Sequence, residues 1–236
     1  MHRFSLALLG ASFAVGLSAC VGKSDSSATS IPVIDTSSLS LSSPDFGAGE
    51  AMPLEFTCDG GDFGSGANPE LDWKPGPDGT KSYALVLKDI SITARMDATT
   101  LSHGYHWAIW NIPSTTTAVP HDLSDAEFPP EVAGARQWAI RDQFGYFPPC
   151  PNSDPTVAAA DEVTDTYTFA LYAIPTETLK DPAYDAATPN YVETLDAYLK
   201  TVAIKAGELL FTSDAASASA PAPLDPSTVE PPSTSN

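Results

Sequence analysis

The chain has 236 residues, with 11 Lys and Arg against 30 Asp and Glu, so its formal net charge is −19. This charge argues against nucleic acid and against anionic lipid as electrostatic partners, because both require a basic face on the protein. A hydrophobic content of 42% is enough for a packed core, and 22 prolines favour short strands joined by turns over long helices.

The N-terminal segment has the features of an export signal. Arg3 supplies a positive charge, and the apolar stretch that follows it is too short to span a bilayer as a permanent helix. We therefore predict a signal peptide over residues 1–19. Cleavage of an ordinary signal peptide near Ala19 is one interpretation. We favour a bacterial lipoprotein signal, which the segment resembles, because Leu17 and two small residues precede Cys20, the residue that would be lipidated.

The next segment, residues 20–36, is Ser-rich and lacks aromatic residues, which predicts a flexible tether. Val21 stands where an aspartate retains some lipoproteins in the inner membrane. We therefore predict a location in the bacterial cell envelope, lipid-anchored to the outer membrane and facing the periplasm. Each buried CH₂ of an acyl chain contributes about 0.8 kcal/mol, so such an anchor holds in spite of the negative charge.

Five segments of the body are rich in β-branched and aromatic residues or alternate apolar with polar residues, which predicts strands. They are Leu54–Cys58, Ser82–Lys88, Tyr105–Ile112, Thr166–Ile174 and Glu208–Phe211. Residues 191–203 have helical apolar spacing, with Thr188 as the expected N-cap, Pro189 as the first helical residue and Gly207 at the end. The predicted fold class is mainly β with a C-terminal helix packed on the sheets.

The C-terminal segment, residues 213–236, contains no Lys, Arg or aromatic residue. Such a segment buries too little apolar area to offset its ordering entropy. We predict a disordered tail rich in Ser, Ala and Pro, which leaves residues 37–212 as one folded domain.

Motifs for common chemistries are absent from the sequence. The Gly-rich run over residues 60–66 lacks the Lys of a phosphate-binding loop, and no Gly-x-Ser-x-Gly, His-Glu-x-x-His or Cys-x-x-Cys occurs. His103, His106 and His121 do not have the spacing of metal ligands. We therefore expect no metal and no cofactor.

Two cysteines, Cys58 and Cys150, remain in the body of the chain. Export would bring them into an oxidising compartment, where disulfides persist. The sequence alone does not place them within bonding distance, so a disulfide and two buried thiols both remain open.

Polar or rigid residues stand beside several of the predicted strands. Asp89 follows one strand, His106 lies within the next, and Pro148 and Pro149 precede the strand that contains Tyr167. Taken separately, each has a structural interpretation: a turn residue, a core histidine and a rigid loop.

Six motifs occur in order along the body. They are Pro69–Trp73, Leu85–Asp89, His106–Trp107, Asn111–Pro113, Gly145–Pro151 and Tyr167–Ala173. As an ordered set they resemble the phosphatidylethanolamine-binding protein family, in its bacterial Raf-kinase-inhibitor-like branch, over about residues 40–212. The resemblance implies two antiparallel sheets in a Greek-key arrangement, a C-terminal helix and a small pocket for phosphate or a phospholipid headgroup.

The resemblance also implies the residues of that pocket. They are Asp89, His106, Tyr146, Pro148, Pro149 and Tyr167. The chain departs from the family pattern after Asp89, where a second acid and two prolines are missing, and before Tyr167, where Asp165 stands in place of a histidine. A carboxylate at this position would repel phosphate.

The function that the resemblance implies is that of a membrane-anchored, extracytoplasmic binding or regulatory protein, not an enzyme. Its partner would be a small anion, a phospholipid headgroup or a segment of a periplasmic protein. One alternative is an envelope interaction module with a degenerate pocket. The other is a hydrolase in which His106 and either Asp89 or Asp165 form an acid–base pair, although no activated nucleophile is visible.

Overall fold

The computed structural model describes residues 39–60, 67–95, 104–140, 144–152, 162–180 and 190–216, with side chains up to Ile92 in the second of these ranges. The predicted signal peptide, the tether with Cys20, and most of the predicted tail lie outside the described residues. His103, Thr188 and Pro189 also lie outside them.

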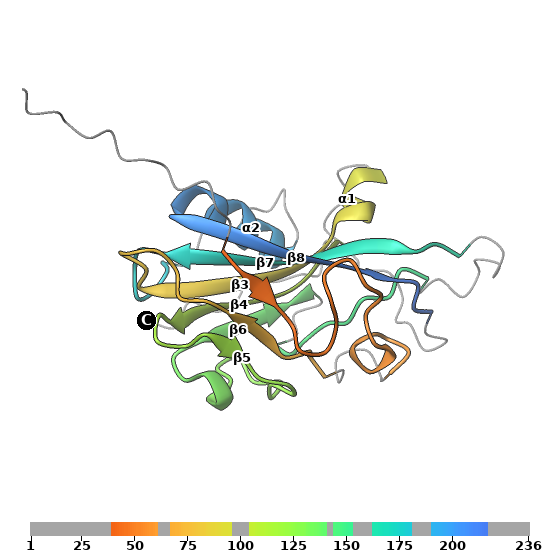
Figure 1. The fold of residues 1–236 in the computed structure, drawn as a ribbon, viewed down its shortest axis with the longest axis horizontal. Coiled ribbons are helices and arrows are strands. Elements are labelled where there is room, and N and C mark those ends of the chain that lie inside the picture. The colour runs from red at the N-terminus through yellow and green to blue at the C-terminus, as the bar shows by residue number, and fades with distance from the viewer. Residues whose placement is uncertain are drawn as a thin grey trace, which may run out of the picture. The chain divides into compact units, whose positions relative to one another are not determined.

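A five-stranded antiparallel sheet forms the centre of the body (Figure 1). Its strands, in spatial order, are β6 (Arg136–Ala139), β4 (Tyr105–Pro113), β3 (Ser82–Asp89), β7 (Asp165–Ile174) and β8 (Lys205–Ser213). The chain runs through β3, β4 and β6 and then returns to place β7 beside β3. This is the spatial order 4-1-2-3 of a Greek key.

A second, three-stranded antiparallel sheet packs against one face of the first. Its strands, in spatial order, are β1 (Leu41–Ser42), β2 (Leu71–Trp73) and β5 (Ala118–Val119). The prediction of a mainly β protein with two antiparallel sheets is therefore confirmed. Within the described ranges, no helix has the length and apolar character required to cross a membrane.

The predicted strands that begin at Ser82, Tyr105 and Thr166 are confirmed within one residue at each end. The strand predicted over residues 54–58 is wrong, because Leu54–Phe56 form a short 3-10 helix, η1. Two hydrogen bonds from Thr57 close this turn. Its backbone N–H and its hydroxyl both donate to the Leu54 carbonyl, at 3.0 and 2.8 Å. Such local bonds compete with strand pairing. A second 3-10 helix, η3, spans Pro130–Val132.

Helix α2 spans Tyr191–Val202, as the apolar periodicity predicted, but its ends differ from those expected. Asn190 is the N-cap, and its side chain accepts from the Val192 N–H at 2.9 Å. Gly207 does not end the helix; it lies within β8, where a Cβ would collide with the Leu39 carbonyl oxygen. This glycine therefore permits a close backbone approach rather than a helix cap.

The described body has a sheet–sheet–helix arrangement with two apolar cores. One core lies between the two sheets and includes Leu85, Trp107, Phe169 and Phe211. The other lies between the large sheet and α2. Side chains alternate along β3 and β4, so each strand contributes to both cores.

A buried ion pair joins α2 to the large sheet. Asp196 of α2 is fully buried, and the Lys88 Nζ lies 3.3 Å from its Oδ1 atom. The Tyr172 hydroxyl donates to the same oxygen at 2.6 Å, and the Lys200 Nζ lies 2.7 Å from Oδ2. Asp196 therefore has two cations and one hydroxyl around its carboxylate.

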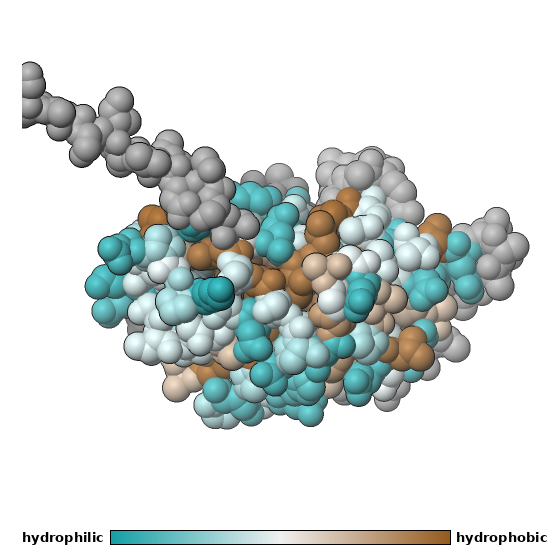
Figure 2. Space-filling view, in the orientation of Figure 1, coloured by the Kyte–Doolittle hydropathy of each residue, from teal (hydrophilic) through white to brown (hydrophobic). Residues whose placement is uncertain are grey.

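Short helix α1 (Ile90–Arg95) follows β3 directly. Its Ser91 side chain accepts from the Thr166 N–H at 2.8 Å, so the start of the helix is bound to β7. In the space-filling view, apolar atoms gather between the two helices on the face that is shown (Figure 2). The exposed large apolar side chains include Ile90 and Leu210, at 36% and 42% exposure.

The C-terminal end of the folded body extends past residue 212. Ser213 is the last residue of β8, and Ala215 is buried. Residues 213–216, which the sequence assigned to a disordered tail, therefore belong to the fold.

Candidate functional site

Several predicted site residues meet at one end of the large sheet, where β3 ends and where β4 and β7 begin. Asp89 is the last residue of β3 and pairs in register with Tyr167 of β7. The His106 ring, from β4, meets the Tyr167 ring edge-on with centroids 5.5 Å apart. The structure thus brings together residues that lie up to 78 positions apart in the sequence.

A β-bulge sets the direction of His106. Leu87 pairs with Trp107 and Lys88 pairs with Tyr105, so His106 is an extra residue between two paired positions. In a regular strand His106 would point to the α2 face, opposite to Trp107. The extra residue places Tyr105 against the α2 core and turns His106 to the other side. Bulges of this kind re-aim side chains next to functional sites.

A backbone carbonyl fixes the tautomer of His106. The Nδ1 atom lies 3.2 Å from the Pro148 carbonyl oxygen, which can only accept a hydrogen bond. Nδ1 therefore carries the proton and donates it. In the neutral ring Nε2 is then the acceptor, and protonation of Nε2 gives the ring a second donor.

Asp89 is buried, and its carboxylate accepts several hydrogen bonds. Its Oδ1 accepts from the Ile92 N–H at 2.8 Å, at the start of α1, and its side chain also bonds the Tyr167 hydroxyl and the Asp165 carboxyl. Burial raises the pKa of Asp89, and the hydrogen bonds, led by that from Ile92, oppose this rise.

Asp165 lies beside Asp89 and is equally buried, at 2% exposure. It is the first residue of β7 and shares a face of that strand with Tyr167, two positions on. The hydrogen bond between the Asp165 and Asp89 side chains lowers the pKa of Asp89 and so opposes the effect of burial. The repulsion of phosphate by Asp165 stays a prediction.

Tyr167 keeps its hydroxyl proton throughout the neutral range. Burial, followed by the charges of Asp89 and Asp165, raises its pKa well above the ordinary value of 10.0. Its ring stacks on Phe211 of β8, with centroids 5.5 Å apart and an interplanar angle of 12°. Tyr167 is therefore a rigidly held hydrogen-bond donor.

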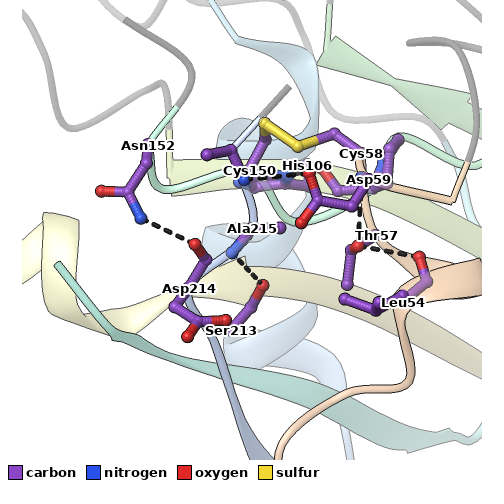
Figure 3. Close-up of a disulfide and its surroundings, with 12 residues drawn as sticks. Leu54, Thr57, Cys58, Asp59, His106, Cys150, Asn152, Ser213, Asp214 and Ala215 are labelled. Atoms are coloured by element: carbon purple, nitrogen blue, oxygen red, sulfur yellow. Dashed lines mark hydrogen bonds between the residues drawn. A yellow bond between two sulfur atoms is a disulfide. The ribbon is translucent and has the colours of Figure 1, made fainter. Parts of the chain in front are cut away.

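The Pro148–Pro149 wall lies beside His106 and is tied to a distant loop. The Pro149 carbonyl accepts from the Cys58 N–H at 3.1 Å. Cys58 and Cys150 form a disulfide with a Cα–Cα distance of 5.5 Å, and His106 lies close to it (Figure 3). Of the two alternatives that the sequence left open, the structure contains the disulfide.

Tyr146 does not join the other predicted site residues. Its hydroxyl donates to the Phe56 carbonyl at 3.1 Å and lies 3.7 Å from the Met52 Sδ, while its ring packs edge-on against Trp107. It is buried in the core between the sheets, and burial raises its pKa. The structure thus places Tyr146 in this core, and its role in lining a pocket stays a prediction.

Sequence reasoning missed Asn152, which follows the Pro148–Pro149 wall. Its Nδ2 donates to the Val163 and Asp214 carbonyls at 2.9 and 2.8 Å, and its Oδ1 accepts from the Val163 N–H at 2.8 Å. Its backbone N–H donates to the Ala215 carbonyl at 3.1 Å. The only available signal was an Asn directly after Cys-Pro, which is an ordinary turn pattern.

The described part of the chain holds no group of three His, Cys, Asp or Glu residues that could ligate a metal. His121 pairs instead with Asp45, with 2.7 Å between the His121 Nε2 and the Asp45 Oδ2. The groups gathered at the sheet end are thus one imidazole, one phenol and two carboxyl groups. Together they can donate and accept hydrogen bonds, and an imidazole is the side chain that ordinarily gains or loses a proton near neutral pH.

The sequence profile of the phosphatidylethanolamine-binding protein family matches residues 42–212. The chain belongs to this family. The match covers both sheets, α2 and all the residues of the sheet end described above. The resemblance that the motifs predicted is therefore confirmed.

Individual relatives agree with this assignment. A UPF0098 protein of Aquifex aeolicus is 36% identical over 108 residues, which are 45% of this chain and 54% of that protein. UPF0098 protein YbcL of Escherichia coli is 37% identical over 91 residues, which are 39% of this chain and 43% of that protein. The chain thus spans about half the length of these two relatives.

A relative from Mycobacterium tuberculosis, LppC, carries a name that describes it as a candidate lipoprotein. It is 27% identical over 190 residues, which are 74% of this chain and 81% of LppC. These three relatives have uncharacterised-family or lipoprotein names, and none of the three names is that of an enzyme.

Two solved structures share the fold. The crystal structure of E. coli YbcL, described as a new member of the mammalian family, has a TM-score of 0.56 at 21% identity and aligns with 75% of this chain and 99% of YbcL. That of CT736 from Chlamydia trachomatis has a TM-score of 0.52 at 21% identity and aligns with 74% of this chain and 96% of CT736. At this identity the likeness concerns the fold.

Proposed function

We propose that this chain is an extracytoplasmic binding protein whose site, at the end of the large sheet, takes a small anion or a phospholipid headgroup. The observation that carries the proposal is the bulge that turns His106 toward Tyr167 and the Pro148 wall. A protonated His106 has a second donor at Nε2 for a phosphate oxygen, and proline rings make a wall that has no N–H to satisfy.

Asp165 makes this anion site weak. At an effective dielectric constant of about 20, two like charges about 4 Å apart repel by about 4 kcal/mol, and screening lowers this repulsion. We expect tighter binding of phosphorylethanolamine at pH 6 than at pH 8, because His106 gains a proton. Calorimetric titration at both pH values measures this.

Three variants test the site. His106→Ala is expected to abolish binding of phosphorylethanolamine and Asp165→His to tighten it. Tyr83→Phe is the control and is expected to leave binding unchanged, because the Tyr83 hydroxyl is bonded to the Gly76 N–H and Tyr83 lies near the opposite end of β3 from Asp89. Equal affinity in wild type and His106→Ala would remove the anion site. Unchanged affinity in Asp165→His alone would remove the repulsive role of Asp165.

One observation favours a second candidate, an envelope interaction module without a ligand site. The side chains at the sheet end are at most 7% exposed; they are Asp89, Tyr167 and His106. The Asp89 carboxylate also accepts the hydrogen bond of the Tyr167 hydroxyl, which a ligand would otherwise receive. In this case phosphate, phosphorylethanolamine and acetate would all fail to raise the melting temperature. Turnover of an ester substrate, lost in Asp89→Asn, would instead support a hydrolase that uses the carboxyl pair with His106.

The anchor belongs to the same proposal, with attachment to the outer membrane on its periplasmic side through Cys20. The name of LppC and the lipoprotein-like residues before Cys20 support it. Cys20→Ala is expected to move the protein from the membrane fraction to the soluble fraction, since lipid chains would be the anchor. A cleaved variant that stays in the membrane fraction would contradict this.

A further inference from the structure

The wall beside the site contacts it through main-chain atoms. The Pro148 carbonyl accepts from the His106 Nδ1, and the Cys150 backbone hydrogen-bonds the Tyr167 hydroxyl. The identity of the wall side chains therefore matters less to these two contacts than the position of the wall backbone. Whatever holds that backbone also sets the hydrogen bonding of His106 and Tyr167.

Strand pairing is poorly suited to hold this wall. Residues 148, 149 and 151 are prolines, which have no backbone N–H to donate to a neighbouring strand. Two other sets of interactions hold the wall. The first set is the Cys58–Cys150 disulfide together with the hydrogen bond from the Cys58 N–H to the Pro149 carbonyl.

The second set comes from Asn152, which holds the wall with its amide (Figure 3). It bonds Val163, two residues before Asp165, and also the Asp214 and Ala215 carbonyls after β8. Asn152 thus fixes the wall to the segment that enters β7 and to the segment that leaves β8. We refer to Cys58, Cys150 and Asn152, with the residues that Asn152 bonds, as the clasp.

The clasp is separate from the two main cores. Cys58, Cys150 and Ala215 form a small apolar cluster of their own, which contains no residue of the core between the sheets or of the core under α2. Opening the clasp therefore removes few contacts of the main cores. We therefore expect loss of the clasp to displace the wall backbone while the rest of the body stays folded.

We propose that the clasp positions the site, and that reduction of the Cys58–Cys150 disulfide weakens ligand binding while the body stays folded. The expected loss of ligand binding rests on the proposed function, whereas the expected change in the hydrogen bonding of the His106 ring does not. Reduction by a dithiol transfers two electrons: one thiolate attacks a sulfur, the other cysteine leaves as a thiolate, and the second thiol of the reductant resolves the mixed disulfide. Two protein thiols and one oxidised dithiol result.

The test uses the mature chain with oxidised and reduced cysteines, the Cys58→Ser/Cys150→Ser variant, and Asn152→Ala. Asn68→Ala is the matched control. Asn68 is a buried asparagine that also ties loops together, through the Pro69, Pro120 and Leu123 backbones, away from the wall. The readout is the pH titration of the His106 ring in NMR spectra, assigned with His106→Ala, with His121 as an internal reference.

We expect the His106 titration midpoint to move in the reduced protein, in the double serine variant and in Asn152→Ala, but not in Asn68→Ala. Loss of one positioned hydrogen bond corresponds to roughly a five-fold change in affinity, so we expect phosphorylethanolamine to bind about five-fold more weakly. The midpoint of His121 is expected to stay in place, because its partner Asp45 lies outside the clasp.

Two results would overturn the proposal. One is an unchanged His106 midpoint in both the reduced protein and Asn152→Ala. The other is loss of the near-ultraviolet circular dichroism of the whole body on reduction, which would make the disulfide a general stabilising bond. A shifted His106 midpoint without binding of phosphorylethanolamine by any form would reject the proposed function and leave the role of the clasp intact.

Discussion

Two buried aspartates, Asp196 and Asp89, lie on opposite faces of the same sheet and have different partners. Asp196 is bonded by the Lys88 and Lys200 ammonium groups and by the Tyr172 hydroxyl. Asp89 is bonded by backbone N–H groups, by the Tyr167 hydroxyl and by the carboxyl group of Asp165.

The difference indicates what each region does. The ion pairs of Asp196 fasten α2 to the sheet. Asp89 is buried beside a second carboxyl group, and burial raises its pKa. A buried carboxyl group with a raised pKa is a candidate for a functional role. Lys88 and Asp89 are neighbours in β3, and successive side chains of a strand point to opposite faces of the sheet. Lys88 therefore contributes to the ion pair with α2, whereas Asp89 lies at the candidate site on the other face.

The largest expected effect is that of Lys88→Ala on stability. Removal of one partner of a buried ion pair costs about 3–5 kcal/mol, and we expect the low end because Lys200 remains. Urea unfolding measures the change in free energy. Lys200→Ala is the control, since this lysine is half exposed, and exposed pairs contribute at most about 1 kcal/mol. Equal losses in the two variants would mean that burial does not distinguish the lysines.

A matched pair of tyrosine variants comes next. Tyr172→Phe and Tyr167→Phe each remove a hydroxyl that donates to a buried aspartate. A hydrogen bond to a charged group contributes about 1.5–3 kcal/mol, so we expect Tyr172→Phe to lower the free energy of unfolding by this amount at neutral pH.

Tyr167→Phe is expected to raise the pKa of Asp89 further, because the lost bond favours the carboxylate. Measurement of both unfolding free energies at pH 5 and pH 8 separates the two variants. A loss that depends equally on pH in both would contradict the assignment of Asp89 as the titrating aspartate.

The smallest expected effect is the dependence of stability on pH at Asp89. The folded pKa is raised above 3.8, so the folded state holds the proton more firmly than the unfolded chain. The contribution of Asp89 to stability is therefore present below about pH 4 and is lost as the pH rises through the folded pKa. The difference between wild type and Asp89→Asn, followed by urea unfolding from pH 4 to 8, isolates it. A difference that grows in favour of wild type as the pH rises would reverse the sign and reject the raised pKa.

The long strands and α2 could be predicted from the sequence because each carries its own apolar pattern. Residues 82–89 and 165–174 are rich in β-branched and aromatic residues, and residues 191–202 keep helical spacing. The family resemblance of the ordered motifs also implied that Asp89, His106 and Tyr167 share one site. The strands and the helix, by contrast, depend on local composition, which a single sequence contains.

Features that depend on tertiary contacts could not be predicted. The bulge at His106 is visible only in the pairing of β3 with β4, and the core role of Tyr146 depends on the Phe56 carbonyl, 90 residues away. Gly207 has the signature of a helix end, yet it serves the approach of Leu39 to β8. Each of these depends on a partner that is distant in the chain.

The hydrogen bond between the Leu39 N–H and the Ala206 carbonyl has a consequence for presentation of the site. Leu39 is held at the beginning of β8, whereas Tyr167 stacks on Phe211 near the end of that strand. At about 3.3 Å per residue, these five residues separate the two points by about 17 Å. The N-terminal end of the described body and the His106 site therefore lie at opposite ends of the same strand.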